Sequence, residues 1–306
     1  MELLNVRSRK SPHYGYLVSY INLRGHSIWS TEHSGKGEPV LLLHGGLSST
    51  ESWDYLVLPA LKRRHVFAYD RTAHGRTKIR DGFYHFDFQV EEAIAYLEDV
   101  VKQPAHLIGW SDGAIIALLI AIRRPELVKS LVSIGGNYHY DCGLSLEFIL
   151  DTSEEEYEKF EARSGQPRAI LDQIKKKAFE VWASEPTMTT KQLATITCPV
   201  LVLAGDDEPF PLAHTVSLFE SLPDGRLAVI PGSSHSFVKE KPELLQTMIK
   251  DFYHQQEFPI TRSPNRRKEK QEKILEAQGA ERMSGDKRKK RRYWIDSLIR
   301  RTLGRP

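Results

Sequence analysis

Residues 109–113 read Gly-Trp-Ser-Asp-Gly, and this stretch decides how the rest of the chain is interpreted. It fits the pattern G-x-S-x-G, which places a serine on a sharp turn between a buried strand and a helix. The context that the pattern requires is present, because the apolar run Ala105 to Ile108 precedes it and the helix-like segment Ala114 to Arg124 follows. Larger side chains at positions 109 and 113 would collide with such a turn. The stretch therefore predicts that Ser111 is a catalytic nucleophile.

The same alternation of strand and helix extends in both directions from this turn. Further apolar runs with the length and composition of buried parallel strands cover residues 39–43, 65–70, 130–134, 199–204 and 226–230. Helix-like segments between or after them cover residues 86–101, 212–221 and 241–253. Strands that alternate with helices predict an α/β protein with a mostly parallel, doubly wound sheet.

One segment breaks this rhythm. Residues 137–197 contain no strand candidate, and their most helix-prone parts are residues 153–161 and 169–183. The segment is too long for a plain connection. We expect a small helical cap, or lid, over the strand ends, where open parallel sheets bind their ligands. The alternative is a helical excursion that packs on the edge of the sheet.

These boundaries predict a core formed by residues 22–136 and 198–254, a cap over residues 137–197 and a C-terminal extension over residues 259–306.

A serine nucleophile needs a base and a group that stabilises the developing oxyanion. His235 lies in a loop just after the last strand candidate and is the expected base. His44-Gly45-Gly46-Leu47 follows the first core strand, and its glycines let the main chain approach a substrate oxygen closely. We expect the backbone amides of Gly46 and Asp112 to form the oxyanion hole, with Leu47 as the fallback.

The acid that orients the base should follow the strand of residues 199–204. Three adjacent carboxylates stand there, Asp206, Asp207 and Glu208. Only one of them can face His235, and close burial of all three would raise their pKa values. Their position in the chain does not choose between them.

Over residues 22–254 the chain resembles the α/β-hydrolase superfamily. The stretch Asp70-Arg71-Thr72-Ala73-His74-Gly75-Arg76-Thr77 looks like the D-x-R-G-x-G-x-S turn of that family, and the residues 109–113 are similar to its esterase and C–C-bond hydrolase branch with helical caps. In that branch the acid stands three residues after a glycine, which implies Glu208 here, in place of the usual aspartate. Asp207 is the alternative. The serine argues against the dehalogenase and epoxide-hydrolase branches, which use aspartate at this position.

The resemblance implies a cytoplasmic serine hydrolase, carboxylesterase-like, that cleaves a carboxylic ester, lactone or thioester through a Ser-His-acid triad. The alternatives are a C–C-bond hydrolase, a cofactor-free perhydrolase and a hydrolase-fold protein that binds a ligand without catalysis. The sequence contains no P-loop, dinucleotide fingerprint or metal-ligand cluster, so no cofactor or metal is expected.

Three residues near the nucleophile are candidates for substrate binding, namely Trp110, Asp112 and Tyr138. An acidic side chain beside the nucleophile suits an ammonium group on the substrate. Asp112 is equally suited to capping the helix that we expect to begin at Gly113, and we favour the cap.

The formal net charge of +3 conceals a basic C-terminal part. Residues 259–306 contain 16 Lys and Arg against 6 Asp and Glu, and residues 293–301 place apolar side chains on one helical face. Such a tail is expected to be a flexible appendage, or to contact an anionic membrane surface, nucleic acid or a protein partner. The two cysteines and the lack of a long apolar run favour the cytoplasm.

Overall fold

The computed structural model describes residues 9–10, 17–144, 146, 151–254 and Glu272. The sheet, its helices and the helical insertion belong to one compact unit, Met1–His254. The basic tail predicted over residues 259–306 lies outside the described residues, apart from Glu272, so its role stays a prediction. In the part of the chain that is described, no helix is long and apolar enough to cross a membrane.

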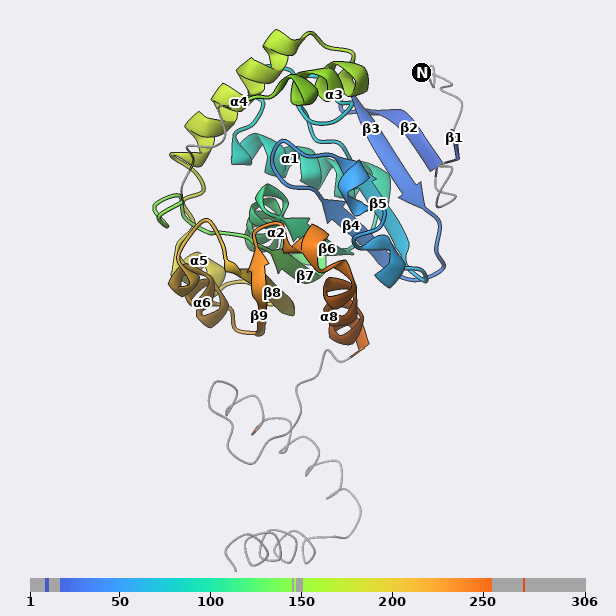
Figure 1. Ribbon diagram of the computed structural model, residues 1–306. Helices are drawn as coiled ribbons and strands as arrows, with labels where there is room; N and C mark the ends of the chain where they lie inside the picture. Colours follow the sequence, from blue (N-terminus) through green and yellow to red (C-terminus); the bar gives the residue numbers. More distant parts are fainter. Residues whose placement is uncertain (1–8, 11–16, 145, 147–150, 255–271, 273–306) are drawn as a thin grey trace, which may run out of the picture. The chain divides into compact units, whose positions relative to one another are not determined.

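In the described part of the chain, nine strands form one sheet in the order β1-β2-β3-β5-β4-β6-β7-β8-β9 (Figure 1). The strands are β1 Arg9–Lys10, β2 Leu17–Leu23, β3 His26–His33, β4 Pro39–Leu43, β5 His65–Tyr69, β6 Ala105–Trp110, β7 Val128–Ile134, β8 Val200–Asp207 and β9 Gly225–Ser234. The six strands from β5 to β9 pair in parallel, whereas β1, β2 and β3 pair antiparallel with each other and β3 with β5. The predicted α/β fold with a mostly parallel sheet is confirmed.

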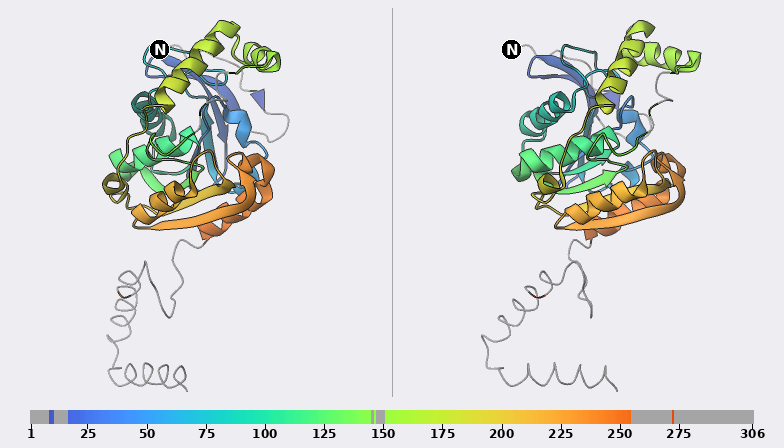
Figure 2. Two further views of the ribbon diagram at one scale, coloured as in Figure 1. Left: turned by 60° about the vertical axis from the view of Figure 1, so that its left-hand side comes forward. Right: turned by 90° about the vertical axis from the view of Figure 1, so that its left-hand side faces the viewer.

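Helices cover both faces of this sheet (Figure 2). They are α1 Phe86–Tyr96, α2 Asp112–Arg123, α3 Glu154–Ser164, α4 Arg168–Trp182, α5 Thr190–Leu193, α6 Leu212–Ser221, α7 Phe237–Glu240 and α8 Pro242–His254. Short 3-10 segments are η1 Thr50–Trp53, η2 Leu58–Ala60 and η4 Pro125–Leu127, and a π-helical segment, η3 Leu97–Val101, continues α1.

Alternate residues of each central strand enter two separate cores, because side chains of a strand point to opposite faces. Leu41 and Leu43 of β4 pack with α1, α2 and α6, while Val40 and Leu42 pack with η1, η2, α7 and α8. All five residues of β4 are buried. Burial on both faces explains why these strands are continuous apolar runs in the sequence.

The segment between β7 and β8 is helical, with α3, α4 and α5 (Figure 1). We call its described residues, 137–144, 146 and 151–197, the cap. A capping box begins α3, in which Ser153 Oγ accepts the Glu156 amide at 3.3 Å and Glu156 Oε2 accepts the Ser153 amide at 3.0 Å. The cap packs on the core through residues of α4, since Ile174, Ala178 and Val181 belong to the same buried cluster as α1 and α2.

The N-terminal hairpin was not anticipated by the sequence reasoning. β2 starts at Leu17, ahead of the expected core boundary at residue 22, and pairs with β3 along seven residues. β2 is exposed or half-exposed except at Leu23, and β3 buries only Ile28 and Ser30, so polar residues interrupt both strands and neither appears as a continuous apolar run.

Candidate active site

Ser111 alone separates strand β6 from helix α2. Its backbone has φ +54° and ψ −120°, a conformation that residues other than glycine rarely adopt. A strained, positive-φ residue of this kind marks the turn in which a nucleophile is held exposed above a sheet. The hydroxyl-bearing side chain lines a cavity at the carboxyl ends of the parallel strands.

Gly109 and Gly113 flank this turn, and neither position has space for a side chain. A Cβ atom at Gly113 would lie 1.8 Å from the carbonyl oxygen of Leu43, and one at Gly109 would lie 2.2 Å from the carbonyl oxygen of Gly113. Both contacts are with backbone atoms, which cannot move aside as a flexible side chain can. The steric reason predicted for these glycines is confirmed.

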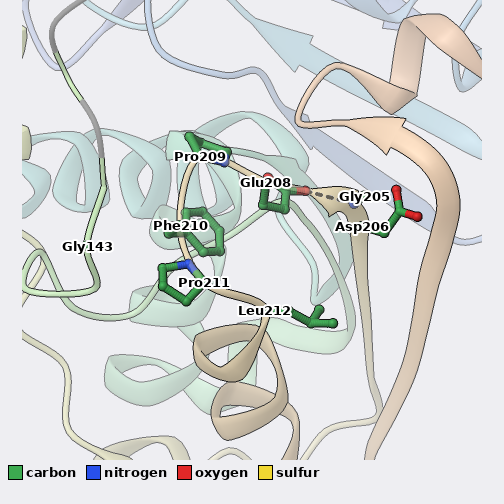
Figure 3. Close-up of a pocket in the computed structure, with 8 residues that line it drawn as sticks. All are labelled: Gly143, Gly205, Asp206, Glu208, Pro209, Phe210, Pro211 and Leu212. Carbon is green, nitrogen blue, oxygen red and sulfur yellow. Dashed lines mark hydrogen bonds between the residues drawn. The ribbon is translucent and has the colours of Figure 1, made fainter.

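His235 directly follows β9 and lines the same cavity as Ser111. Its Nδ1 lies 2.5 Å from Oε2 of Glu208, and the Glu208 side chain is only 1% exposed. The other carboxylate oxygen of Glu208 accepts the Gly205 amide at 2.9 Å (Figure 3). Each carboxylate oxygen of Glu208 thus has one hydrogen-bond partner. The other ring nitrogen of His235, Nε2, is the atom that can bind a substrate or a nucleophile.

The other two carboxylates of this loop do not reach His235. Asp206 accepts the amides of Gly232 and Ser233 at 2.8 and 2.9 Å, and these bonds lower the pKa of its carboxyl. In Figure 3 its side chain extends on the far side of Gly205 from Glu208. Asp207 is exposed. Of the two acids considered from the sequence, the structure brings Glu208 to the histidine and leaves Asp207 in solvent.

The loop after β4 passes close to the nucleophile. A Cβ atom at Gly45 would lie 3.4 Å from Cβ of Ser111. Among the described residues, no loop or turn hydrogen bond to a backbone carbonyl uses the amide of Gly46 or that of Asp112. Both residues line the cavity, as the predicted oxyanion donors would have to.

The cavity has a volume of about 380 Å³. Its core-side wall includes Gly46, Trp110, Ser111, Asp112 and His235. Its cap-side wall includes Asp151, Glu156, Lys175, Trp182 and Glu185. The cap therefore contributes side chains to the cavity that Ser111 lines, and three carboxylates and one lysine are among them.

The family model for the alpha/beta hydrolases matches residues 40–245. The chain belongs to the alpha/beta hydrolase family.

Relatives of this alpha/beta hydrolase are hydrolases of different kinds. The (E)-2-((N-methylformamido)methylene)succinate hydrolase of Acinetobacter baylyi is 25% identical over 234 residues, covering 68% of this chain and 88% of that protein. Serine hydrolase BPHL of Mus musculus is 24% identical over 239 residues, covering 71% and 80%. The crystal structure of the alpha/beta hydrolase MGS-M2, from a deep-sea metagenome library, is similar with a TM-score of 0.67 and 21% identity, covering 79% of this chain and all of that one. The relatives support a general role in hydrolysis, and the structural likeness shows the fold.

Asp112 of this hydrolase is buried at the wall of the cavity, 3% exposed. Helix α2 begins at Asp112 and not at Gly113, and no side chain caps its first turn, so the predicted capping role is wrong. Within the described part of the chain, Oδ2 has no hydrogen-bond partner. Burial raises the pKa of Asp112 to about 6, although the charge of Arg71 opposes the shift.

Trp110 lines the cavity as predicted, but Tyr138 does not occur in its described lining. The Tyr138 ring stacks on His214 with 4.1 Å between centroids, and its hydroxyl lies 3.0 Å from Oγ of Ser217. These contacts direct Tyr138 toward α6, and the structure gives no support to its predicted contact with substrate.

Several residues of the hydrolase site had no sequence signal. The cap residues Lys175 and Glu185 lie in polar, helix-prone sequence in which charged side chains are normally solvated. Lys175 is instead 5% exposed, and its Nζ donates to the Asp151 carbonyl and to Thr152 Oγ1 at 2.8 and 2.9 Å. The buried Arg71, which contacts the loop after β4, was likewise not singled out.

Proposed function

We propose that this protein is a serine hydrolase that cleaves a carboxylic ester, lactone or thioester by way of an acyl-enzyme. The observation that carries the proposal is the contact between His235 Nδ1 and Glu208 Oε2, together with the lining of one cavity by both His235 and the strained Ser111. The name of the relative BPHL as a serine hydrolase supports the same class of nucleophile.

The roles follow from the chemistry of the three side chains. Ser111 Oγ attacks the substrate carbonyl while Nε2 of His235 takes its proton. Glu208 holds the imidazole in the tautomer with the proton on Nδ1 and stabilises the imidazolium. The amides of Gly46 and Asp112 donate to the oxyanion of the tetrahedral intermediate. His235 then protonates the leaving oxygen or sulfur, and a water molecule cleaves the acyl-enzyme by the same steps.

Labelling with a fluorophosphonate probe tests this proposal, with Ser111→Ala as the matched control. We expect the wild-type chain to be labelled and to hydrolyse short p-nitrophenyl esters with an initial burst, and the variant to do neither. No label that depends on Ser111, together with no ester hydrolysis, would instead favour a ligand-binding protein without catalysis. Label without ester hydrolysis would favour the C–C-bond hydrolase or perhydrolase alternatives, which a panel of diketone-like substrates and peroxide would separate.

Within this function, the buried carboxylate of Asp112, whose Oδ2 forms no hydrogen bond of normal geometry among the described residues and has the Trp182 indole as a neighbouring donor, suits a substrate with an ammonium group near the acyl carbon. A charge-assisted hydrogen bond of this kind contributes about 1.5–3 kcal/mol. For Asp112→Asn we therefore expect the kcat/KM ratio between an amine-bearing ester and its neutral analogue to fall by about tenfold or more. Equal losses on both esters would contradict this preference.

The pH dependence of the same ratio follows from the raised pKa of Asp112. The carboxyl is ionised above about pH 6 and protonated below it. We expect the wild-type preference for the amine-bearing ester to be full at pH 8 and to decline as the pH falls through about 6. Because both esters use the same catalytic residues, the ratio removes the pH dependence that the two reactions share.

A further inference from the structure

Arg71 is a completely buried cation behind the loop that borders the nucleophile. Arg71 is 0% exposed, and within the described residues its guanidinium donates to no carboxylate. Its acceptors are neutral, namely the carbonyl oxygens of His44 and Gly45, the latter at 3.1 Å, and Oε1 of Gln89 at 2.8 Å. The buried carboxylates of Asp112 and Glu92 interact with this charge through space, but neither accepts a hydrogen bond from it. The hydrogen bonds of Arg71 therefore go to neutral groups, two of which belong to the loop that borders Ser111.

A second donor reaches the same carbonyl of Gly45. The backbone amide of Arg71 donates to Nε2 of His44 at 3.2 Å, which assigns the ring proton of His44 to Nδ1. Nδ1 then donates to the Gly45 carbonyl at 2.8 Å. Burial lowers the pKa of His44 well below its usual range, so the ring is neutral and this tautomer is the one required. Arg71 thus acts on the Gly45 carbonyl both directly and through His44.

The carbonyl of Gly45 and the amide of Gly46 belong to one peptide unit. The unit is planar and trans, so its C=O and N–H groups point in opposite directions. Two donors on the carbonyl fix the direction in which the amide points. They also polarise the peptide, which makes its N–H a stronger donor.

We propose that Arg71 is a positioning residue for the oxyanion hole, which holds the Gly45–Gly46 peptide so that the Gly46 amide faces the tetrahedral intermediate. This inference rests on the serine-hydrolase function proposed above. The arginine acts through the peptide and does not touch the substrate.

The test compares Arg71→Met and Arg71→Lys with the wild-type chain on a p-nitrophenyl ester. Methionine keeps an unbranched apolar stem but has no donors, whereas lysine keeps the charge without the planar guanidinium that donates to two carbonyls. For Arg71→Met we expect kcat to fall about 100-fold, the effect of losing one oxyanion donor, with KM changed less than about threefold. For Arg71→Lys we expect a loss of about tenfold.

Two further readouts distinguish positioning from a general loss of structure. Affinity for an aryl boronic acid, which forms a charged tetrahedral adduct with the serine, should fall about as much as kcat, whereas affinity for the product carboxylate should not. All rates are expressed per site labelled to completion by the fluorophosphonate probe. Since only folded sites are labelled, a variant that is partly unfolded still gives an interpretable kcat.

Thr72→Val is the matched control. The Thr72 side chain is buried in the same turn and donates to Glu92, and within the described residues its hydroxyl forms no hydrogen bond with the His44–Gly46 loop. We expect this variant to lower the thermal midpoint while its kcat per labelled site stays within about threefold of wild type. An Arg71→Met variant that behaves like Thr72→Val would overturn the proposal. A wild-type chain without label or hydrolysis would overturn the serine-hydrolase function itself.

Discussion

Replacing Glu208 with glutamine is expected to lower kcat by about 10⁴-fold without disturbing the fold. The Oε1 atom of glutamine can still accept the Gly205 amide, as Glu208 does at 2.9 Å. Its amide nitrogen would then face Nδ1 of His235, which forces the ring proton onto Nε2. With a proton already on Nε2, the histidine cannot accept the proton of Ser111. Steady-state hydrolysis of a p-nitrophenyl ester measures the loss.

Asp207→Asn is the matched control for this change, because it also replaces a carboxylate by its amide, one residue away. Asp207 is exposed and does not contact His235. We expect its kcat to stay within about twofold of wild type, the size of a typical exposed substitution. A larger loss in Asp207→Asn than in Glu208→Gln would assign the acid to the other carboxylate.

Gly113→Ala is expected to have the largest effect on stability. The added Cβ would lie 1.8 Å from the carbonyl oxygen of Leu43 and 2.8 Å from that of His44. Both oxygens belong to the central strand β4 and the loop after it, so the clash can be relieved only by moving α2 away from the sheet. We expect the free energy of unfolding to fall by about 3 kcal/mol or more. Urea unfolding followed by tryptophan fluorescence measures this loss.

Gly165→Ala separates the steric effect from the cost of backbone conformation. Gly165 ends α3 with φ +65°, and a Cβ atom there would meet nothing within 4 Å. Its replacement should cost only about 1 kcal/mol, the penalty for a left-handed alanine. Equal losses at both positions would mean that the close approach of Gly113 to β4 is not what requires glycine.

The parallel core of the fold was predictable because its strands are buried on both faces. β4 is such a strand, and the predicted residues 39–43 coincide with it. Burial on both faces does not apply to the β2–β3 hairpin, whose strands are largely exposed or half-exposed. Their sequences mix polar with apolar residues, as loop sequences do, so the hairpin could not be predicted from continuous apolar runs. Helix α2 was placed two residues late, since its first turn includes part of the Gly-Trp-Ser-Asp-Gly stretch.

The site was predictable wherever a residue type is tied to a position in the fold. Ser111 and His235 each follow a strand and are the only natural choices there, and the structure lines one cavity with both. The sequence alone left Asp206, Asp207 and Glu208 open, because the direction of adjacent side chains in a loop depends on backbone angles. Arg71 could not be recognised at all, since arginine is rarely buried and nothing in its neighbours signals an interior position.

The cavity wall is divided between the core and the cap, and this division affects how substrate preference can change by mutation. The cap-side wall comes from a single continuous stretch of the chain, whereas the nucleophile, histidine and acid are carried by the sheet. Mutations in α3 and α4 can therefore reshape substrate preference while the sheet keeps the reacting groups in register. A library restricted to Asp151, Glu156, Lys175, Trp182 and Glu185 is where directed evolution should find new specificities with the fewest inactive clones.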